Sequence, residues 1–273
     1  MNRMNRNKLF SPALTVGAAL LGALAAMAVP CGVLCQEKEA ALTKAEAQTL
    51  VSLKQALMRD SSKCAAQAEA LLANDATTNP AMRRKLATIQ EVIRASKGSS
   101  GDLGARLEAI YQDAGCDKLI LIDLAPRVVH PGHLNADGLR AIQGLEQLAT
   151  KDGLMLWPIP YIRTKAQIHL RVGDCEKAVT ELERIREFQS PKEAGRFGSD
   201  VTLPKQDKDI LLRKATAGQL ERLAAVYEAW AALLEEGKGQ LAETYAASAG
   251  LRADAKQARR IAEIKSAAAQ ANK

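Results

Sequence analysis

The stretch YIRTKAQIHLRVGDCEKAVTELERIREF, residues 161–188, decides the fold that the sequence predicts. Apolar residues recur at helical spacing on both sides of Gly173 and Asp174. Gly173 can adopt the left-handed backbone that ends a helix, and the Asp174 carboxylate can accept the free amide hydrogens at the start of the next helix. The stretch therefore predicts two antiparallel helices joined by a tight turn, which is a helical hairpin.

The composition of the whole chain favours the same class of structure. Of its 273 residues 47% are hydrophobic, which suffices for a sizeable core, but only 3% are aromatic. Alanine, leucine, lysine, glutamate and arginine dominate, and all of them are strong helix formers. The β-branched and aromatic runs that strands prefer are nearly absent. We therefore predict an all-α protein of stacked antiparallel helical hairpins, arranged as an α-solenoid or as an irregular helical bundle.

Residues 1–36 carry the features of an export signal. Arg3, Arg6 and Lys8 precede an uncharged, largely apolar run over residues 9–36, which is the order of features that the export machinery reads. We therefore predict a signal peptide or an N-terminal signal anchor. The protein that follows is expected to be exported, either periplasmic or anchored to the membrane and facing away from the cytoplasm.

The fate of this leader stays open among three alternatives. Residues 26–28 read Ala-Met-Ala, a small-x-small pattern that predicts cleavage before Val29. Without cleavage the apolar run is long enough, as a helix, to span the roughly 30 Å of hydrocarbon in a bilayer. Lipid attachment at Cys31 or Cys35 is the third alternative, although neither cysteine follows the small residue that lipoprotein signals usually carry.

The formal net charge of +7 is weak evidence for an anionic partner. Three of the basic residues, Arg3, Arg6 and Lys8, belong to the leader and are lost if the leader is removed. The remaining excess of positive charge is too small to indicate nucleic-acid binding. We therefore expect no nucleic-acid partner.

Apolar periodicity and capping residues divide the region before the central hairpin into helices. We predict a helical hairpin domain over residues 37–188, with helices near 40–59, 64–73, 80–97, 102–115 and 136–149. The apolar segment 119–124 is too short for periodicity to separate strand from helix. Because a single strand would have no partner, we favour a helical or irregular segment, which Pro126 and the turn at residues 130–133 bring to an end.

The region after the hairpin is less regular. Residues 189–206 contain two prolines and two glycines, and they predict a mobile loop. A C-terminal helical hairpin is expected over residues 207–250, with helices at 216–236 and 240–248. Residues 251–273 follow Gly250 and predict a basic, partly frayed helical tail.

The central hairpin resembles a tetratricopeptide repeat over about Tyr161 to Pro191, which makes residues 160–191 the repeat-like unit. The likeness rests on the Gly-Asp turn and on small and apolar residues in both helices, namely Ala166, Leu170, Gly173, Asp174, Ala178 and Leu182, with Pro191 near the family's terminal proline. The resemblance implies an α-solenoid whose concave face binds a peptide or another protein.

The sequence contains no clear catalytic motif. It lacks a Gly-x-Ser-x-Gly elbow, a phosphate-binding loop and a dinucleotide fingerprint. His130 and His133 could present two imidazoles to a metal, with Cys116, Asp123 or Asp137 as further ligands. This spacing matches no known zinc cluster, however, and a turn between the histidines explains the segment more simply. We therefore predict no catalytic residues, no cofactor and no metal site.

The cysteines after the leader are Cys64, Cys116 and Cys175. In an oxidising compartment Cys64 and Cys116 could form a disulfide that joins the first two hairpins. Helical packing could equally bury all three as reduced thiols. The sequence leaves both alternatives open.

These observations predict a non-enzymatic scaffold or adaptor that binds another protein or peptide in the bacterial cell envelope. The expected contact surface is the first helix of the central hairpin, with Arg163, Gln167 and Arg171 as polar contacts, together with the loop 189–206. A retained N-terminal segment would add membrane association. Two alternatives remain: a helical structural subunit of an envelope secretion or conjugation apparatus, and a metal-dependent hydrolase that uses His130 and His133.

Overall fold

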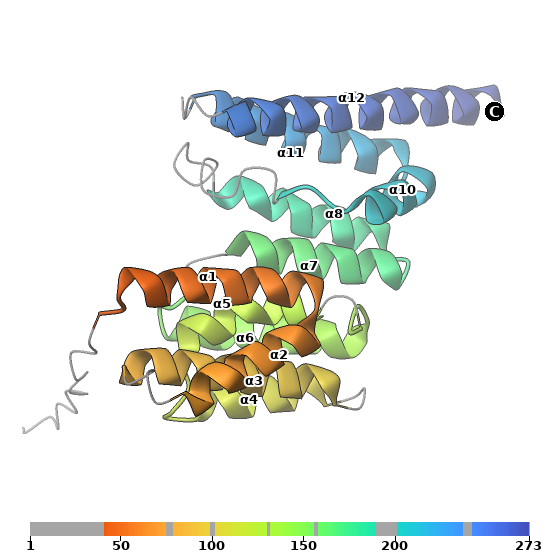
Figure 1. Cartoon of the computed structure of the whole chain (residues 1–273). Helices are drawn as coiled ribbons and strands as arrows, with labels where there is room; N and C mark the ends of the chain where they lie inside the picture. The colour runs from red at the N-terminus through yellow and green to blue at the C-terminus, as the bar shows by residue number, and fades with distance from the viewer. Residues whose placement is uncertain are drawn as a thin grey trace, which may run out of the picture. The chain divides into compact units, whose positions relative to one another are not determined.

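The computed structural model describes residues 41–74, 79–98, 102–129, 132–155, 158–188, 201–236 and 242–272. Within these ranges the protein holds eleven α-helices, one 3-10 helix and no strand, so the predicted all-α class is confirmed (Figure 1). The chain divides into two units, residues 1–38 and 39–273, and every described residue belongs to the second. The predicted leader, residues 1–36, therefore lies outside the described residues. None of the described helices combines the length and the apolar character needed to cross a bilayer.

The helices follow one another along the chain, and the longest stretch between two of them is residues 189–204. They are α1 (Lys44–Arg59), α2 (Ser61–Ala73), α3 (Pro80–Lys97), α4 (Leu103–Gln112), α5 (Lys118–Val129), α6 (Ala136–Lys151), α7 (Pro158–Arg171), α8 (Cys175–Glu183), the 3-10 helix η1 (Arg184–Phe188), α10 (Lys205–Lys214), α11 (Ala217–Glu236) and α12 (Ala242–Ala271). Several neighbours in sequence pack against each other, above all α11 with α12 and α7 with α8 (Figure 1).

Local side chains fix several of the helix starts that the sequence predicts. Asn79 precedes Pro80 and accepts a hydrogen bond from Ala81 N, so α3 begins with a side-chain cap and a first-turn proline. In the central hairpin Gly173 has a φ of 88°, and Asp174 Oδ1 accepts from Lys177 N at 3.0 Å. The predicted hairpin is thus present as α7 and α8, and its last turn is the 3-10 helix η1.

Helix α7 is shared by two hydrophobic cores. Between Tyr161 and Leu170 every residue except Arg163 is buried, which is the pattern of a helix covered on all sides. Tyr161 and Ile168 belong to the core formed with α1–α6, whereas four other residues of α7 belong to the core formed with α8–α12, namely Ile159, Ile162, Ala166 and Leu170. The two cores are therefore joined through this one helix.

Pro126, one of the two features predicted to end the apolar segment, does not end it. It lies buried inside α5, which continues to Val129. A proline has no N–H, so the carbonyl of Ile122 loses the donor that a helix normally supplies four residues later. The hydroxyl of Tyr161 on α7 donates to that carbonyl at 3.0 Å. A tertiary hydrogen bond thus replaces the missing helical one.

The last residues of the predicted loop 189–206 also differ from the prediction, because they are packed or helical. Residues 189–200 lie outside the described residues, but Val201 and Leu203 are buried in the second core. Helix α10 begins directly after Pro204, so residues 205–206 are helical. This helix was not predicted, and it packs on α7.

The C-terminal tail is helical, as predicted, but the predicted break at Gly250 is absent. Helix α12 runs through Gly250, and it buries Leu251, Ala255, Ala258 and Ala262 in the second core. A glycine inside a helix costs only about 1 kcal/mol relative to alanine, which this packing can offset. The predicted hairpin therefore consists of α11 and the whole of α12.

Candidate functional site

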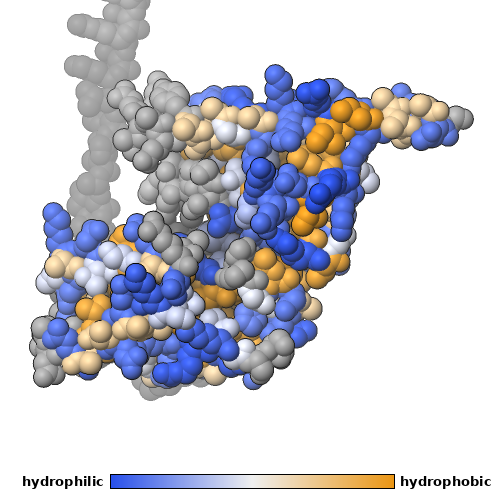
Figure 2. All heavy atoms as spheres, turned by 45° about the vertical axis from the view of Figure 1, so that its right-hand side comes forward, coloured by the Kyte–Doolittle hydropathy of each residue, from blue (hydrophilic) through white to orange (hydrophobic). Residues whose placement is uncertain are grey.

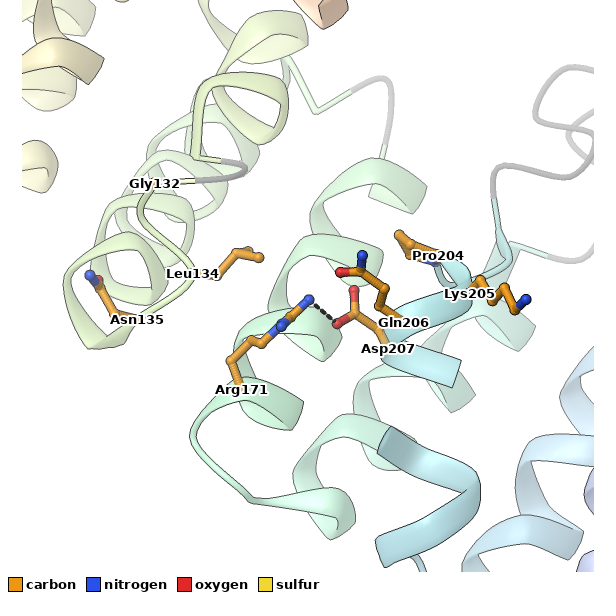
Figure 3. Close-up of a pocket in the computed structure, with 8 residues that line it drawn as sticks. All are labelled: Gly132, Leu134, Asn135, Arg171, Pro204, Lys205, Gln206 and Asp207. Carbon is orange, nitrogen blue, oxygen red and sulfur yellow. Dashed lines mark ion pairs between the residues drawn. The ribbon is translucent and has the colours of Figure 1, made fainter. Parts of the chain in front are cut away.

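An open pocket of about 710 Å³ lies where three segments meet (Figure 3). The connection between α5 and α6 contributes Gly132, Leu134 and Asn135, the C-terminal end of α7 contributes Arg171, and the start of α10 contributes Pro204, Lys205, Gln206 and Asp207. Most of these residues come from turns and helix ends, where backbone and side-chain polar groups are available to a ligand.

The α5–α6 wall of the pocket is fixed by local interactions. Asn135 Oδ1 caps α6 by accepting from Asp137 N at 3.0 Å and from Gly138 N at 3.1 Å. A Cβ at Gly138 would lie 1.8 Å from the backbone oxygen of His133, so only glycine allows this close approach of the turn to the helix. The wall is therefore held rigidly by the cap and by the tight turn.

The opposite wall depends on Asp207, a fully buried carboxylate on α10. Gln167 Nε2 donates to Asp207 Oδ2 at 2.9 Å, and a terminal nitrogen of Arg171 lies 2.7 Å from Asp207 Oδ1. Figure 3 shows the Arg171 and Asp207 side chains pointing toward each other across the space between α7 and α10. Two residues of α7 thus hold α10 in place by its carboxylate.

The three predicted contact residues, Arg163, Gln167 and Arg171, do not form one exposed surface. Gln167 is buried and bound to Asp207, so it does not lie on an exposed face, which corrects the prediction. Arg163 is half-buried and has contacts of its own. Arg171 is the one of the three that lines the pocket, with 36% of its side chain exposed. The physical reason for the difference is α10, which covers this side of α7.

The side chains around the pocket combine hydrogen-bonding groups with a small apolar surface. In Figure 3 Leu134 points from the α5–α6 connection toward Arg171, and the Gln206 amide lies beside Asp207. The Lys205 ammonium points away from Arg171. A guanidinium has five N–H donors, and the contact with Asp207 leaves others available. Such a wall can bind a polypeptide segment that carries both amide groups and an apolar side chain.

A buried charge network supports α7 on its other side. Lys165 has a side-chain exposure of 3%, and it pairs with Glu146 of α6 and with Glu181 of α8. Arg184 pairs with the same two carboxylates, at 3.2 Å and 2.9 Å. The two cations and two anions balance, so we interpret the network as structural. The sequence alone does not reveal this network, since its members lie on four different elements, α6, α7, α8 and η1.

The residues of the alternative metal site are not gathered in the described part of the chain. His130 lies outside the described residues. His133 is buried, and its Nε2 lies 2.8 Å from the backbone oxygen of Ser96. Among the described residues no group of three histidine, cysteine, aspartate or glutamate side chains converges. His133 therefore contributes to packing the turn.

The disulfide between Cys64 and Cys116 is absent, and Cys64, Cys116 and Cys175 are all free thiols. Cys64 Sγ donates to the backbone oxygen of Leu53 within its own hairpin, at 3.3 Å. Burial raises the pKa of the Cys116 thiol to about 11. Cys64 and Cys175 are buried, as the alternative of packed thiols predicts, whereas Cys116 is half-buried.

Comparisons with family models, with curated proteins and with solved structures found no match. The resemblance of α7 and α8 to a tetratricopeptide repeat therefore stays a prediction.

Proposed function

We propose that this protein is an exported, non-enzymatic scaffold or adaptor of the bacterial cell envelope that binds another protein. The pocket between the α5–α6 connection, α7 and α10 is the docking position for a segment of that partner. The observation that carries the proposal is the preorganised pocket itself, in which Arg171 is held by Asp207 while about a third of its side chain stays exposed.

The ordered walls of the pocket support its role as a binding site rather than an incidental depression of the surface. One wall is fixed by the Asn135 cap, and the other by the contacts of Asp207 with Gln167 and Arg171. A wall that is already ordered loses little conformational entropy when a partner docks, which favours affinity. The mixed polar and apolar lining matches the chemistry of a peptide segment better than that of a purely charged or purely apolar ligand.

The export part of the proposal rests on the basic and apolar residues of the leader, which precede the described unit. Outside the cytoplasm the partner would be another envelope protein or a peptide within it. A retained leader would in addition keep the adaptor close to the membrane.

Site-specific photo-crosslinking in cells tests this function. A photoreactive amino acid at Gln206, which is exposed and lines the pocket, is expected to give one discrete crosslinked product. The matched control is Gln112, which is exposed at the end of α4 and does not line the pocket. Equal products from both positions, or none from Gln206, would remove the pocket from consideration as the docking position.

A further inference from the structure

The outward face of α12 carries an unusual exposed side chain. Ile264 is 59% exposed, which is more than Val51, Leu119 or Val172, the other large hydrophobic residues exposed in the described ranges. On a helix the residues that share its face lie three, four and seven positions away. Of the residues at those positions, Ile261 is half-buried against the second core, and the others are exposed, namely Gln257, Arg260, Ala267, Ala268 and Ala271.

Ile264 lies where α12 leaves the rest of the body. Helix α12 has 30 residues and its neighbour α11 has 20, a difference of about 15 Å at about 1.5 Å per residue. Figure 1 shows the C-terminal end of α12 extending past α11, and Figure 2 shows this end standing out with apolar and hydrophilic surface side by side. Lys265 anchors the start of the extension by donating to the backbone oxygens of Arg213 and Ala215.

The charges of α12 separate into two groups. Its inward and lateral charged residues are paired with other helices, in the pairs Arg252–Glu235, Asp254–Lys208 and Arg259–Glu228. The outward residues Lys256, Arg260 and Glu263 form no ion pair with any described residue. Opposite charges that stand one helical turn apart, without an internal partner, are available to a second molecule.

We infer that the outward face of α12 pairs with the same face of a second copy of this chain, with the two helices antiparallel. A two-fold axis midway between Arg260 and Glu263 sets each Arg260 opposite Glu263 of the other copy, so one arrangement forms two ion pairs. A contact of this kind is self-complementary, as two-fold interfaces must be. Charge complementarity on a single face is what selects a second copy as the occupant.

The apolar residues fit the same arrangement. In that register Ile264 packs on the methylene stem of Arg260 of the other copy, and the small side chains at Ala267 and Ala271 let the helices approach closely. The interface is a single helix pair, which is smaller than the standard interface of a stable complex. The dimer is therefore weak and dependent on concentration. It would present two docking pockets to a partner, and it stands independently of the proposed function.

Sedimentation velocity of the full-length chain in a mild detergent, over a range of concentrations, tests the inference. The wild type is expected to shift from monomer to dimer as concentration rises. Ile264→Asp, Arg260→Glu and Glu263→Arg should each weaken the dimer about tenfold or more, because each change occurs twice in a two-fold contact. Far-ultraviolet circular dichroism checks that these exposed substitutions leave the fold intact.

The charge swap decides the arrangement. The double variant with Arg260→Glu and Glu263→Arg restores the opposed charges and should recover the wild-type association. If every variant associates as strongly as the wild type, the association comes from the apolar leader and the inference is wrong. A wild type that stays monomeric at all concentrations would also overturn it. If the monomer instead binds vesicles of anionic lipid, and Arg260→Glu abolishes that binding, the face is a membrane contact and the dimer is wrong.

Discussion

The hydrogen bond from the Tyr161 hydroxyl to the Ile122 carbonyl can be tested directly, because the structure gives its cause, which is the proline inside α5. Pro126 lies four residues after Ile122 in α5 and cannot supply the helical N–H. Tyr161 is 1% exposed and Ile122 is fully buried, so no water replaces the donor. Burial also raises the pKa of the Tyr161 hydroxyl, which keeps it protonated as a donor.

The substitution Tyr161→Phe should therefore leave a buried carbonyl without a partner. The loss of an acceptor's only donor in a protein interior costs about 1–3 kcal/mol in the free energy of unfolding. The substitution Pro126→Ala returns an N–H to the position that Ile122 lacks. In that background Tyr161→Phe should cost well under about 1 kcal/mol, because the helix now satisfies the carbonyl itself.

Urea unfolding followed by far-ultraviolet circular dichroism measures all four members of this cycle, provided that the denaturant slope stays constant. Tyr111→Phe is a matched control. The Tyr111 hydroxyl bonds to Asp152 at 2.8 Å and has no link to Pro126, so its cost should be the same in both backgrounds. If Tyr161→Phe also costs the same with proline or alanine at position 126, the explanation of the buried proline is refuted.

Three further predictions follow from other buried groups. Arg171→Ala should cost about 3–5 kcal/mol in the free energy of unfolding, because it leaves the buried Asp207 carboxylate without its cation. Asp207→Asn should cost under about 2 kcal/mol. The reverse order would contradict the role given to the Arg171–Asp207 pair. Burial lowers the pKa of His169 below its ordinary 6.5, so stability should fall as pH drops below about 6.5, and His169→Gln should flatten that slope in thermal melts. Alkylation of the denatured, unreduced chain should modify both Cys64 and Cys116, and a peptide that joins them would show the free thiols to be wrong.

The features that the sequence predicts well depend on near neighbours. The turn between α7 and α8 needs a left-handed residue at Gly173 and a cap at Asp174 that reaches three residues forward. Both signals lie within a few positions of the turn, so pattern and residue type suffice to find it. The same is true of the cap that begins α3.

The features that the sequence misses depend on partners that are distant in sequence. Helix α10 is short and most of its residues are charged. Its position is fixed by Asp207, whose partner Gln167 lies 40 residues earlier. The donor that allows Pro126 inside α5 comes from Tyr161, 39 residues from the carbonyl that it serves. From the sequence alone, Pro126 predicts the end of a helix, and residues 189–206 predict a loop. Of the contact surface expected from the sequence, Arg171 and residues 204–206 line the candidate pocket. The sequence places residues 205–206 in a loop, and it does not predict the helix α10 that positions them.

The burial of α7 on all sides limits how this protein can change over time. A residue inserted into or deleted from the middle of α7 would rotate everything beyond it by roughly 100° about the helix axis. Tyr161 and Ile168 face one core while Ile162 and Leu170 face the other, so no sideways shift of the helix could realign both sets. Substitutions that conserve volume are tolerable there, but changes of length are not. Evolution would be expected to add or remove residues in the connections and to leave the length of this helix alone.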